Sequence, residues 1–119
     1  MENALHGMIP SEIEPLSPLY LSYWKKAKAG DAMGKSFADW KANPARPSMT
    51  IRRNAHIAHW KTPRWLALNE FTRIASFPDA FKWIDRGTGT ERIGNSVPPR
   101  FMQAIAEHIY HTILEPSHG

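Results

Sequence analysis

The sequence predicts a small, mainly helical α+β domain with three or four helices and one short β element. Three observations predict this class. Its 119 residues are the length of one domain. Three stretches, 16–30, 68–76 and 98–114, carry apolar residues at helical spacing. One short segment, 46–53, has Thr50 and Ile51 at its centre and favours an extended chain.

The chain is predicted to begin with a flexible lead-in followed by a helix. Residues 1–15 contain a glycine and two prolines and show no sustained period. Ser17 can then cap a helix whose first helical position is Pro18. Gly30 is placed to end it.

The middle of the chain is predicted to hold a short helix, the β element and a loop. Ser36 can cap a helix over 36–43, in which Phe37 and Trp40 lie three apart. Asn43-Pro44 would stop that helix, and 54–63 is predicted as turn and loop.

The last part of the chain is predicted as helix, loop and helix. The first of these helices ends before Pro78, and residues 85–95 form a loop with three glycines. The final helix begins at Pro98-Pro99. An apolar stripe runs down it through Met102, Ile105, Ala106, Ile109 and Ile113.

Composition excludes several classes of site. The chain has no cysteine, which rules out disulfides, thiolate metal ligands and a cysteine nucleophile within it. No apolar run approaches the roughly 18 residues of a membrane span, and no secretory signal is visible. We therefore expect no membrane partner and a cytoplasmic location.

Positive charge is concentrated in the middle third. Net charge is −3 over 1–24, +8 over 25–64 and −1 over 65–119, and three tryptophans interleave with the basic residues. This composition is typical of a surface that faces nucleic acid. A solvated lysine-rich surface is the alternative.

No catalytic residue and no metal site are predicted. His56 and His59 lie three apart, as do His108 and His111, but a zinc site needs three or four ligands. The stretch "GTGTER" lacks the third glycine of a dinucleotide-binding loop. No serine lies in a nucleophile elbow.

Two motifs near the C-terminus resemble the last two motifs of DNA (cytosine-5) methyltransferases. The final one, "IGNSVPP", covers residues 93–99 without a gap and precedes an apolar helix. The upstream one matches in order and spacing at Arg64, Leu66, Glu70, Arg73, Ile74, Ser76, Phe77, Pro78, Asp79 and Phe81. The strong resemblance covers 64–114.

A weaker resemblance extends upstream to about residue 10. It is similar to the variable target-recognition region of bacterial and phage-type members, which often ends in a pair like Thr50-Ile51. The chain then divides into a lead-in (1–15), part of the recognition region (16–63) and a hinge motif with the C-terminal helix (64–119). Ala67 departs from the usual Thr or Ser cap, so we expect the helix to start nearer Asn69.

The resemblance implies the C-terminal part of a larger two-domain methyltransferase. In that family a large domain carries the catalytic cysteine and binds S-adenosylmethionine, and the target cytosine is flipped out of double-stranded DNA. This chain lacks the cysteine, so it implies a catalytic domain supplied in cis or in trans. A fragment, a truncated gene and one subunit of a split enzyme all fit, in a restriction-modification setting.

The resemblance also assigns roles to particular residues. Asn95 and Ser96 are expected to hydrogen-bond the amino-acid end of the cofactor, with Val97 packing beside it. From the residues alone, Ser96 could simply cap the last helix. Arg64, Glu70, Arg73 and Asp79 are expected to set the hinge between domains. Candidates for DNA phosphate contacts are Thr50, Arg52, Arg53 and Lys61.

Two functions remain open at this point. The chain is either the recognition and cofactor-loop part of a methyltransferase, inactive without its catalytic half, or a stand-alone basic DNA-binding module that has lost the chemistry. A partial enzyme would expose the apolar stripe of its last helix and could self-associate through it. A self-sufficient module would bury that stripe.

Overall fold

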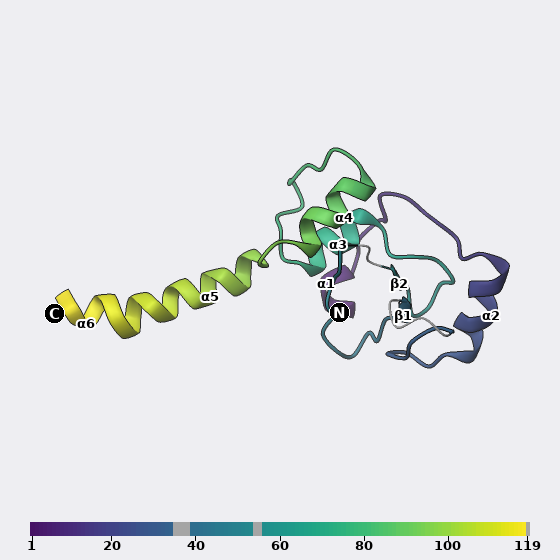
Figure 1. The fold of residues 1–119 in the computed structure, drawn as a ribbon, viewed down its shortest axis with the longest axis horizontal. Coiled ribbons are helices and arrows are strands. Elements are labelled where there is room, and N and C mark those ends of the chain that lie inside the picture. The colour runs from purple at the N-terminus through teal and green to yellow at the C-terminus, as the bar shows by residue number, and fades with distance from the viewer. Residues whose placement is uncertain (35–38, 54–55, 119) are drawn as a thin grey trace.

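A compact body and one projecting helix make up the molecule (Figure 1). The computed structural model describes residues 1–34, 39–53 and 56–118. It measures 62 × 29 × 26 Å and has a radius of gyration of 16.8 Å. A compact chain of this length would have a radius of about 13.5 Å. The difference reflects the C-terminal helix, which leaves the body and extends away from it (Figure 1).

The N-terminal residues pack on the body, in contrast to the predicted flexible lead-in. They form a short helix, α1 (Glu2–Leu5), whose Leu5 is buried in the core. The helix that follows, α2, spans Pro18–Lys26. Ser17 caps it as predicted, accepting a hydrogen bond from the backbone N–H of Tyr20. It ends earlier than Gly30, with Ala27 as its C-cap.

A two-stranded parallel sheet stands where the sequence predicted a helix and a loop. β1 spans Asp39–Lys41 and β2 spans His56–Ala58. The helix predicted over 36–43 is therefore wrong where the chain is described; its cap Ser36 and its residue Phe37 lie outside the described residues. The β element predicted near Thr50 is also wrong, because that segment is irregular and leads into β2.

The next helix, α3 (Leu68–Ile74), confirms the prediction for this part of the chain. Its N-cap is Ala67, so the expected shift toward Asn69 is wrong. The missing cap side chain is replaced from the N-terminal residues. Glu12 Oε1 accepts from the N–H of Leu68 at 2.7 Å, and Ser11 Oγ accepts from the N–H of Asn69 at 3.3 Å.

Residues 85–95 were predicted as a loop, but most of them form α4 (Arg86–Gly94). Asp85 caps this helix by accepting from the N–H of Thr88 at 2.8 Å. The glycines allow close packing rather than unusual dihedrals. A Cβ at Gly89 would come within 2.9 Å of the Leu68 side chain.

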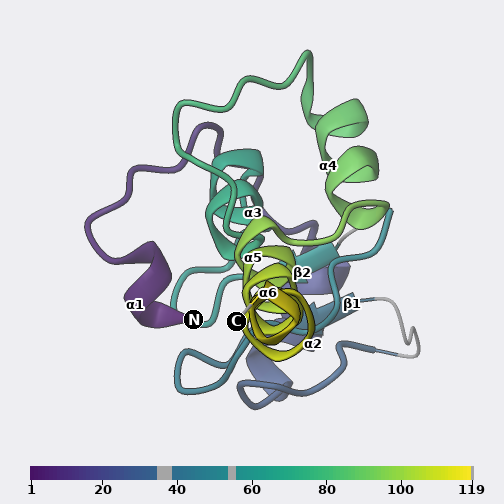
Figure 2. The ribbon, with the colours of Figure 1, turned by 90° about the vertical axis from the view of Figure 1, so that its left-hand side faces the viewer.

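The last helix confirms the predicted start at the two prolines. α5 spans Pro99–Ile109, a π-helical turn, η1, spans Tyr110–Leu114, and α6 spans Glu115–His118. Every residue from 101 to 116 is exposed. Seen nearly end-on in Figure 2, this rod stands in front of the body. The α+β class, dominated by helices, is thus confirmed.

Candidate cofactor and nucleic-acid interface

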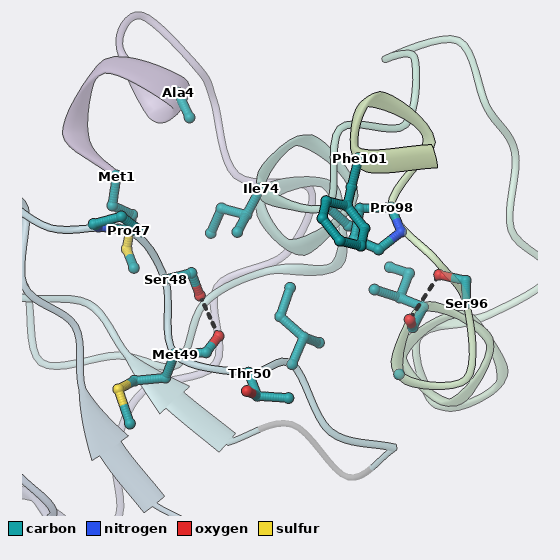
Figure 3. A pocket seen from close by; sticks show the side chains of 14 residues that line it. Met1, Ala4, Pro47, Ser48, Met49, Thr50, Ile74, Ser96, Pro98 and Phe101 are labelled. Atoms are coloured by element: carbon teal, nitrogen blue, oxygen red, sulfur yellow. Dashed lines mark hydrogen bonds between the residues drawn. The ribbon is translucent and has the colours of Figure 1, made fainter. Parts of the chain in front are cut away.

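The predicted cofactor loop, residues 95–97, and part of the predicted recognition region, residues 47–51, meet at one hollow. The hollow has a volume of about 590 Å³ and lies between 47–51 on one side and the turn from α4 to α5 on the other (Figure 3). Thr50 and Ser96, predicted for different ligands, both line it. Its wall is otherwise mostly apolar, with Met49, Ile74 and Phe101 among the lining residues.

The contact between these two segments depends on Gly94. A Cβ at this position would lie 2.4 Å from the backbone nitrogen of Arg53, so the segment can cross the end of α4 only over a glycine. An ion pair joins the same two segments, with 2.7 Å between Arg53 Nη2 and Glu91 Oε1. The predicted DNA segment and the predicted cofactor loop are therefore packed together.

Asn95 and Ser96 differ in how they are bonded. The Ser96 hydroxyl donates to the carbonyl of Ile93 at 2.8 Å, across the end of α4. It does not cap α5, whose N-cap is Pro98 with no side-chain hydrogen bond. Asn95 is exposed and faces a second hollow of about 690 Å³ that also contains Arg92 and Trp83. Val97 is 54% exposed.

The N-terminus of α5 offers few free N–H groups. Pro98 and Pro99 have none, and the N–H of Arg100 donates to Ser76 Oγ at 3.0 Å. Ser76 has a φ of 66°, a left-handed conformation at the end of α3. Ser76, which belongs to the upstream motif, thereby holds the first turn of α5, which directly follows the final motif.

A buried ion pair lies at the predicted hinge. Arg64 Nη1 and Nη2 donate to the two Glu70 oxygens at 2.6 and 3.2 Å. Their side chains are 10% and 4% exposed. Glu70 also accepts from the N–H of Ala67 at 2.8 Å, and Arg64 donates to the carbonyl of Trp65. The pair therefore fixes the entry to α3.

A second, exposed pair follows at the other end of α3. Arg73 donates to Asp79 at 2.5 and 3.1 Å and also to the carbonyl of Ala4 at 3.3 Å. The hydrogen bond from Arg73 lowers the pKa of Asp79, and the bond to Asp79 raises the pKa of Arg73. The four residues predicted for the hinge thus form two ion pairs, one at each end of α3.

The four candidates for phosphate contacts do not form one cluster. Thr50, Arg52 and Arg53 are exposed along one segment beside α4. Lys61 is exposed in the turn after β2, where its backbone N–H donates to His59 Nδ1 at 3.0 Å. Only the first three lie beside the cofactor loop.

Part of the basic middle third has a structural role. Lys41 donates to the carbonyls of Trp24 and Ala27 at the end of α2, at 2.9 and 3.0 Å. Arg64 is buried against Glu70, and Arg53 is paired with Glu91. The exposed basic residues in the described part of this region are Lys25, Lys26, Lys28, Arg46, Arg52, Arg53 and Lys61, and Arg53 stays exposed although it pairs with Glu91.

The comparisons with known proteins identify the family. The family model for C-5 cytosine-specific DNA methylase matches residues 5–111. The chain belongs to this family. The match begins before residue 10 and includes the segments for which recognition, hinge and cofactor roles were predicted.

Relatives of the methylase chain are type II methyltransferases. A putative one from Methanocaldococcus jannaschii is 32% identical over 106 residues, covering 82% of this chain and 34% of its own length. Another, putative, from Oceanobacillus iheyensis is 36% identical over 75 residues, covering 56% of this chain and 16% of its own. One from Brevibacillus brevis is 32% identical over 75 residues, covering 59% of this chain and 20% of its own length. The chain thus spans about a third or less of these relatives, and no solved structure matches it.

Sequence reasoning missed two residues that hold the structure around α3, Arg86 and Glu12. Arg86 donates to Glu12 Oε1 at 2.6 Å and to the carbonyl of Leu66 at 3.1 Å, which ties α4 to the N-terminal residues and to the segment before α3. Burial raises the pKa of Glu12, but hydrogen bonds from the Leu68 N–H, Ser11 and Arg86 outweigh it and lower the pKa overall. The sequence signal for these contacts was Ala67. Because its side chain cannot accept a hydrogen bond, the first N–H groups of α3 need an acceptor from another segment.

Neither a metal-binding cluster nor a membrane-spanning helix is found in the described part of the chain. Within residues 1–34, 39–53 and 56–118, no group of three or more His, Cys, Asp or Glu side chains is placed to hold a metal ion. No helix in that part of the chain is long and apolar enough to cross a membrane.

Proposed function

We propose that this chain is the recognition and cofactor-loop part of a DNA (cytosine-5) methyltransferase that is inactive without a catalytic part. The observation that carries this proposal is the exposed apolar face of α5 and η1. Met102, Ile105, Ile109 and Ile113 are 36–58% exposed on a helix that leaves the body (Figure 1). A stripe of this kind is typical of a face that another protein surface covers.

The chemistry of the family supports the same division. Methyl transfer to cytosine C5 requires a thiolate that attacks C6, and this chain has no cysteine. The relatives extend well beyond the part that this chain matches. The catalytic part is therefore expected in cis or in trans, and the larger two-domain arrangement belongs to the proposal.

The cofactor loop fits the amino-acid end of S-adenosylmethionine, which supplies the methyl group. Since the Ser96 hydroxyl donates to Ile93, its oxygen is left as an acceptor, which suits the ammonium group of the cofactor. The exposed amide of Asn95 can donate to the carboxylate. Val97 is exposed beside them and can pack on the aliphatic part.

The DNA part of the proposal rests on the segment beside this loop. Thr50, Arg52 and Arg53 can hold phosphates within reach of the hollow that Ser96 lines, with Lys61 as a more remote contact. Phosphate contacts of this kind set affinity and register rather than sequence preference. A stand-alone DNA-binding module would bury the apolar stripe of its last helix. The exposed stripe therefore favours the alternative, a partial enzyme.

The test is a complementation assay. This chain is mixed with the N-terminal half of a related methyltransferase, S-adenosylmethionine and duplex DNA, and 5-methylcytosine is measured. We expect methylation only in the mixture, and a large loss with Asn95→Ala combined with Ser96→Ala. Ser22→Ala is the matched control, because this exposed serine donates only to a carbonyl within α2. Salt-sensitive DNA binding by the chain without any methylation in the mixture would favour the stand-alone module.

A further inference from the structure

A buried carboxylate holds an exposed imidazole at the start of the parallel sheet. The register pairs Asp39 with His56, so their side chains lie next to each other on adjacent strands. Asp39 is 4% exposed, whereas the His56 side chain is 55% exposed. The distance from His56 Nδ1 to Asp39 Oδ1 is 3.2 Å.

The same carboxylate is held from its other side. The Tyr20 hydroxyl of α2 donates to Asp39 Oδ2 at 2.7 Å. The ring of Trp65 lies 5.2 Å from the His56 ring at an angle of 34°, and 5.3 Å from the Tyr20 ring. The imidazole is therefore fixed by a hydrogen bond at one edge and by an aromatic ring at its face.

This arrangement sets the tautomer of His56. An ionised carboxylate only accepts hydrogen bonds, so Nδ1 must carry the proton that Asp39 Oδ1 accepts. In the neutral ring, Nε2 is then an acceptor. It belongs to a largely exposed side chain that follows Arg52 and Arg53 by a few residues.

An acceptor of this kind suits a base rather than a phosphate. Phosphate oxygens have no proton to donate, whereas adenine N6 and cytosine N4 present N–H donors in the major groove. Because Asp39 and Trp65 fix the His56 ring before DNA binds, less side-chain entropy is lost on binding. Because the residues around it belong to the basic recognition region, the ligand that fits is duplex DNA.

We propose that His56, positioned by Asp39, reads an exocyclic amino group of adenine or cytosine in the DNA target. This inference rests on the proposed function and adds to it a base-reading residue, where the sequence offered only phosphate contacts. Asp39 is a positioning residue, because it acts through the imidazole and does not itself reach the DNA.

The substitution that tests this proposal removes the acceptor at Nε2 of His56 but keeps a donor for Asp39. His56→Asn keeps an N–H near the place of Nδ1, so Asp39 retains a partner while the acceptor at Nε2 is lost. His6→Asn is the matched control, because His6 is an exposed histidine outside the recognition region. Unfolding of both variants is measured by circular dichroism to show that the body remains folded.

The readout is sequence preference. The whole chain selects sites from a randomised duplex library, and affinities for the preferred site are then compared with those for the same site carrying purine in place of adenine, or a cytosine analogue without N4. We expect wild type and His6→Asn to lose about tenfold in affinity when one particular amino group is removed. His56→Asn should bind both duplexes equally. Long-range ¹H–¹⁵N spectra of the free protein should show His56 protonated at Nδ1.

Several results would overturn the inference. One is a His56 protonated at Nε2, and another is an unchanged base preference in His56→Asn. A third is a loss of affinity that is equal for all sequences and reduces the salt dependence, which would indicate a phosphate contact. If the wild-type chain binds no DNA, the recognition role under the proposed function fails together with this inference.

Discussion

The body of this chain buries its large apolar side chains, whereas the projecting helix leaves its own exposed. In the body, Leu66, Ala67 and Phe71 are fully buried, and each buried side-chain polar atom among the described residues has a hydrogen-bond partner. In the helix beyond Pro99, every residue from 101 to 116 is exposed, although its apolar stripe is continuous. The body buries its apolar side chains within the chain, and the exposed stripe of the helix is the face that we propose another surface covers.

The largest effect on the body is expected from its buried ion pair. Glu70→Ala leaves Arg64 charged and buried without its partner, and we expect the free energy of unfolding to fall by about 3–5 kcal/mol. Glu91→Ala is the control, because its pair with Arg53 is exposed, and its effect should be below about 1 kcal/mol. Chemical denaturation measures both. Equal losses would show that burial does not distinguish the two pairs.

The next largest effect is expected where the recognition segment crosses α4. Gly94→Ala places a methyl group within 2.4 Å of the Arg53 backbone, and we expect a loss of about 1–3 kcal/mol. Gly87→Ala in the same helix is the control, since its methyl would meet only Asp85 Oδ1 at 3.5 Å. That change should stabilise the chain slightly. A neutral Gly94→Ala would mean that the segment is not packed there.

A smaller effect on stability is expected from removing Glu12, which caps α3 from a distant segment. Glu12→Ala removes the acceptor for the Leu68 N–H, and we expect a loss of about 1 kcal/mol at neutral pH. Because the pKa of Glu12 is lowered in the folded state, its contribution is present above its ordinary pKa of 4.5 and is lost as pH falls through the folded value.

The acid limb of the stability curve therefore checks this assignment. Wild type should lose stability below about pH 4.5 more steeply than Glu12→Ala. Parallel acid limbs for wild type and Glu12→Ala would remove Glu12 from the account.

The smallest effect on stability is expected in the projecting helix. Ile105→Asp should change the free energy of unfolding of the body by less than about 0.5 kcal/mol, because the side chain is exposed on a helix that leaves the body (Figure 1). The same change should abolish complementation with the catalytic part. Gln103→Asp, which alters a polar side chain bonded to Glu107, should complement normally. A large loss of stability with Ile105→Asp would place the helix on the body.

The sequence predicted the elements whose signals are local. Ser17-Pro18 marks the start of α2 because a cap and a first-position proline act within one turn. The last helix was predicted from its prolines and its stripe. The match of two motifs predicted the family, which the family model confirms, whereas the contact between the Gly94 turn and Arg53 was not predicted.

The sequence could not predict the elements that depend on distant partners. β1 and β2 have three residues each, and their pairing joins segments 17 residues apart. Three glycines in 85–95 favoured a loop, yet Gly89 and Gly94 are needed for contact with other segments, and Asp85 was the cap that signalled a helix. Residues 1–15 likewise pack through distant contacts: Leu5 is buried in the core, and Glu12 accepts from the N–H of Leu68.

The most direct test of the central claim is hydrogen exchange in the projecting helix. Amides of residues 100–116 are followed in the dilute, monomeric chain and again after adding the catalytic half of a related methyltransferase, with sedimentation confirming the states. We predict rapid exchange in the chain alone and strong protection in the complex, while the amides of α3 remain protected in both. Protection of residues 100–116 in the monomeric chain alone would contradict the claim, because the stripe would then already be covered.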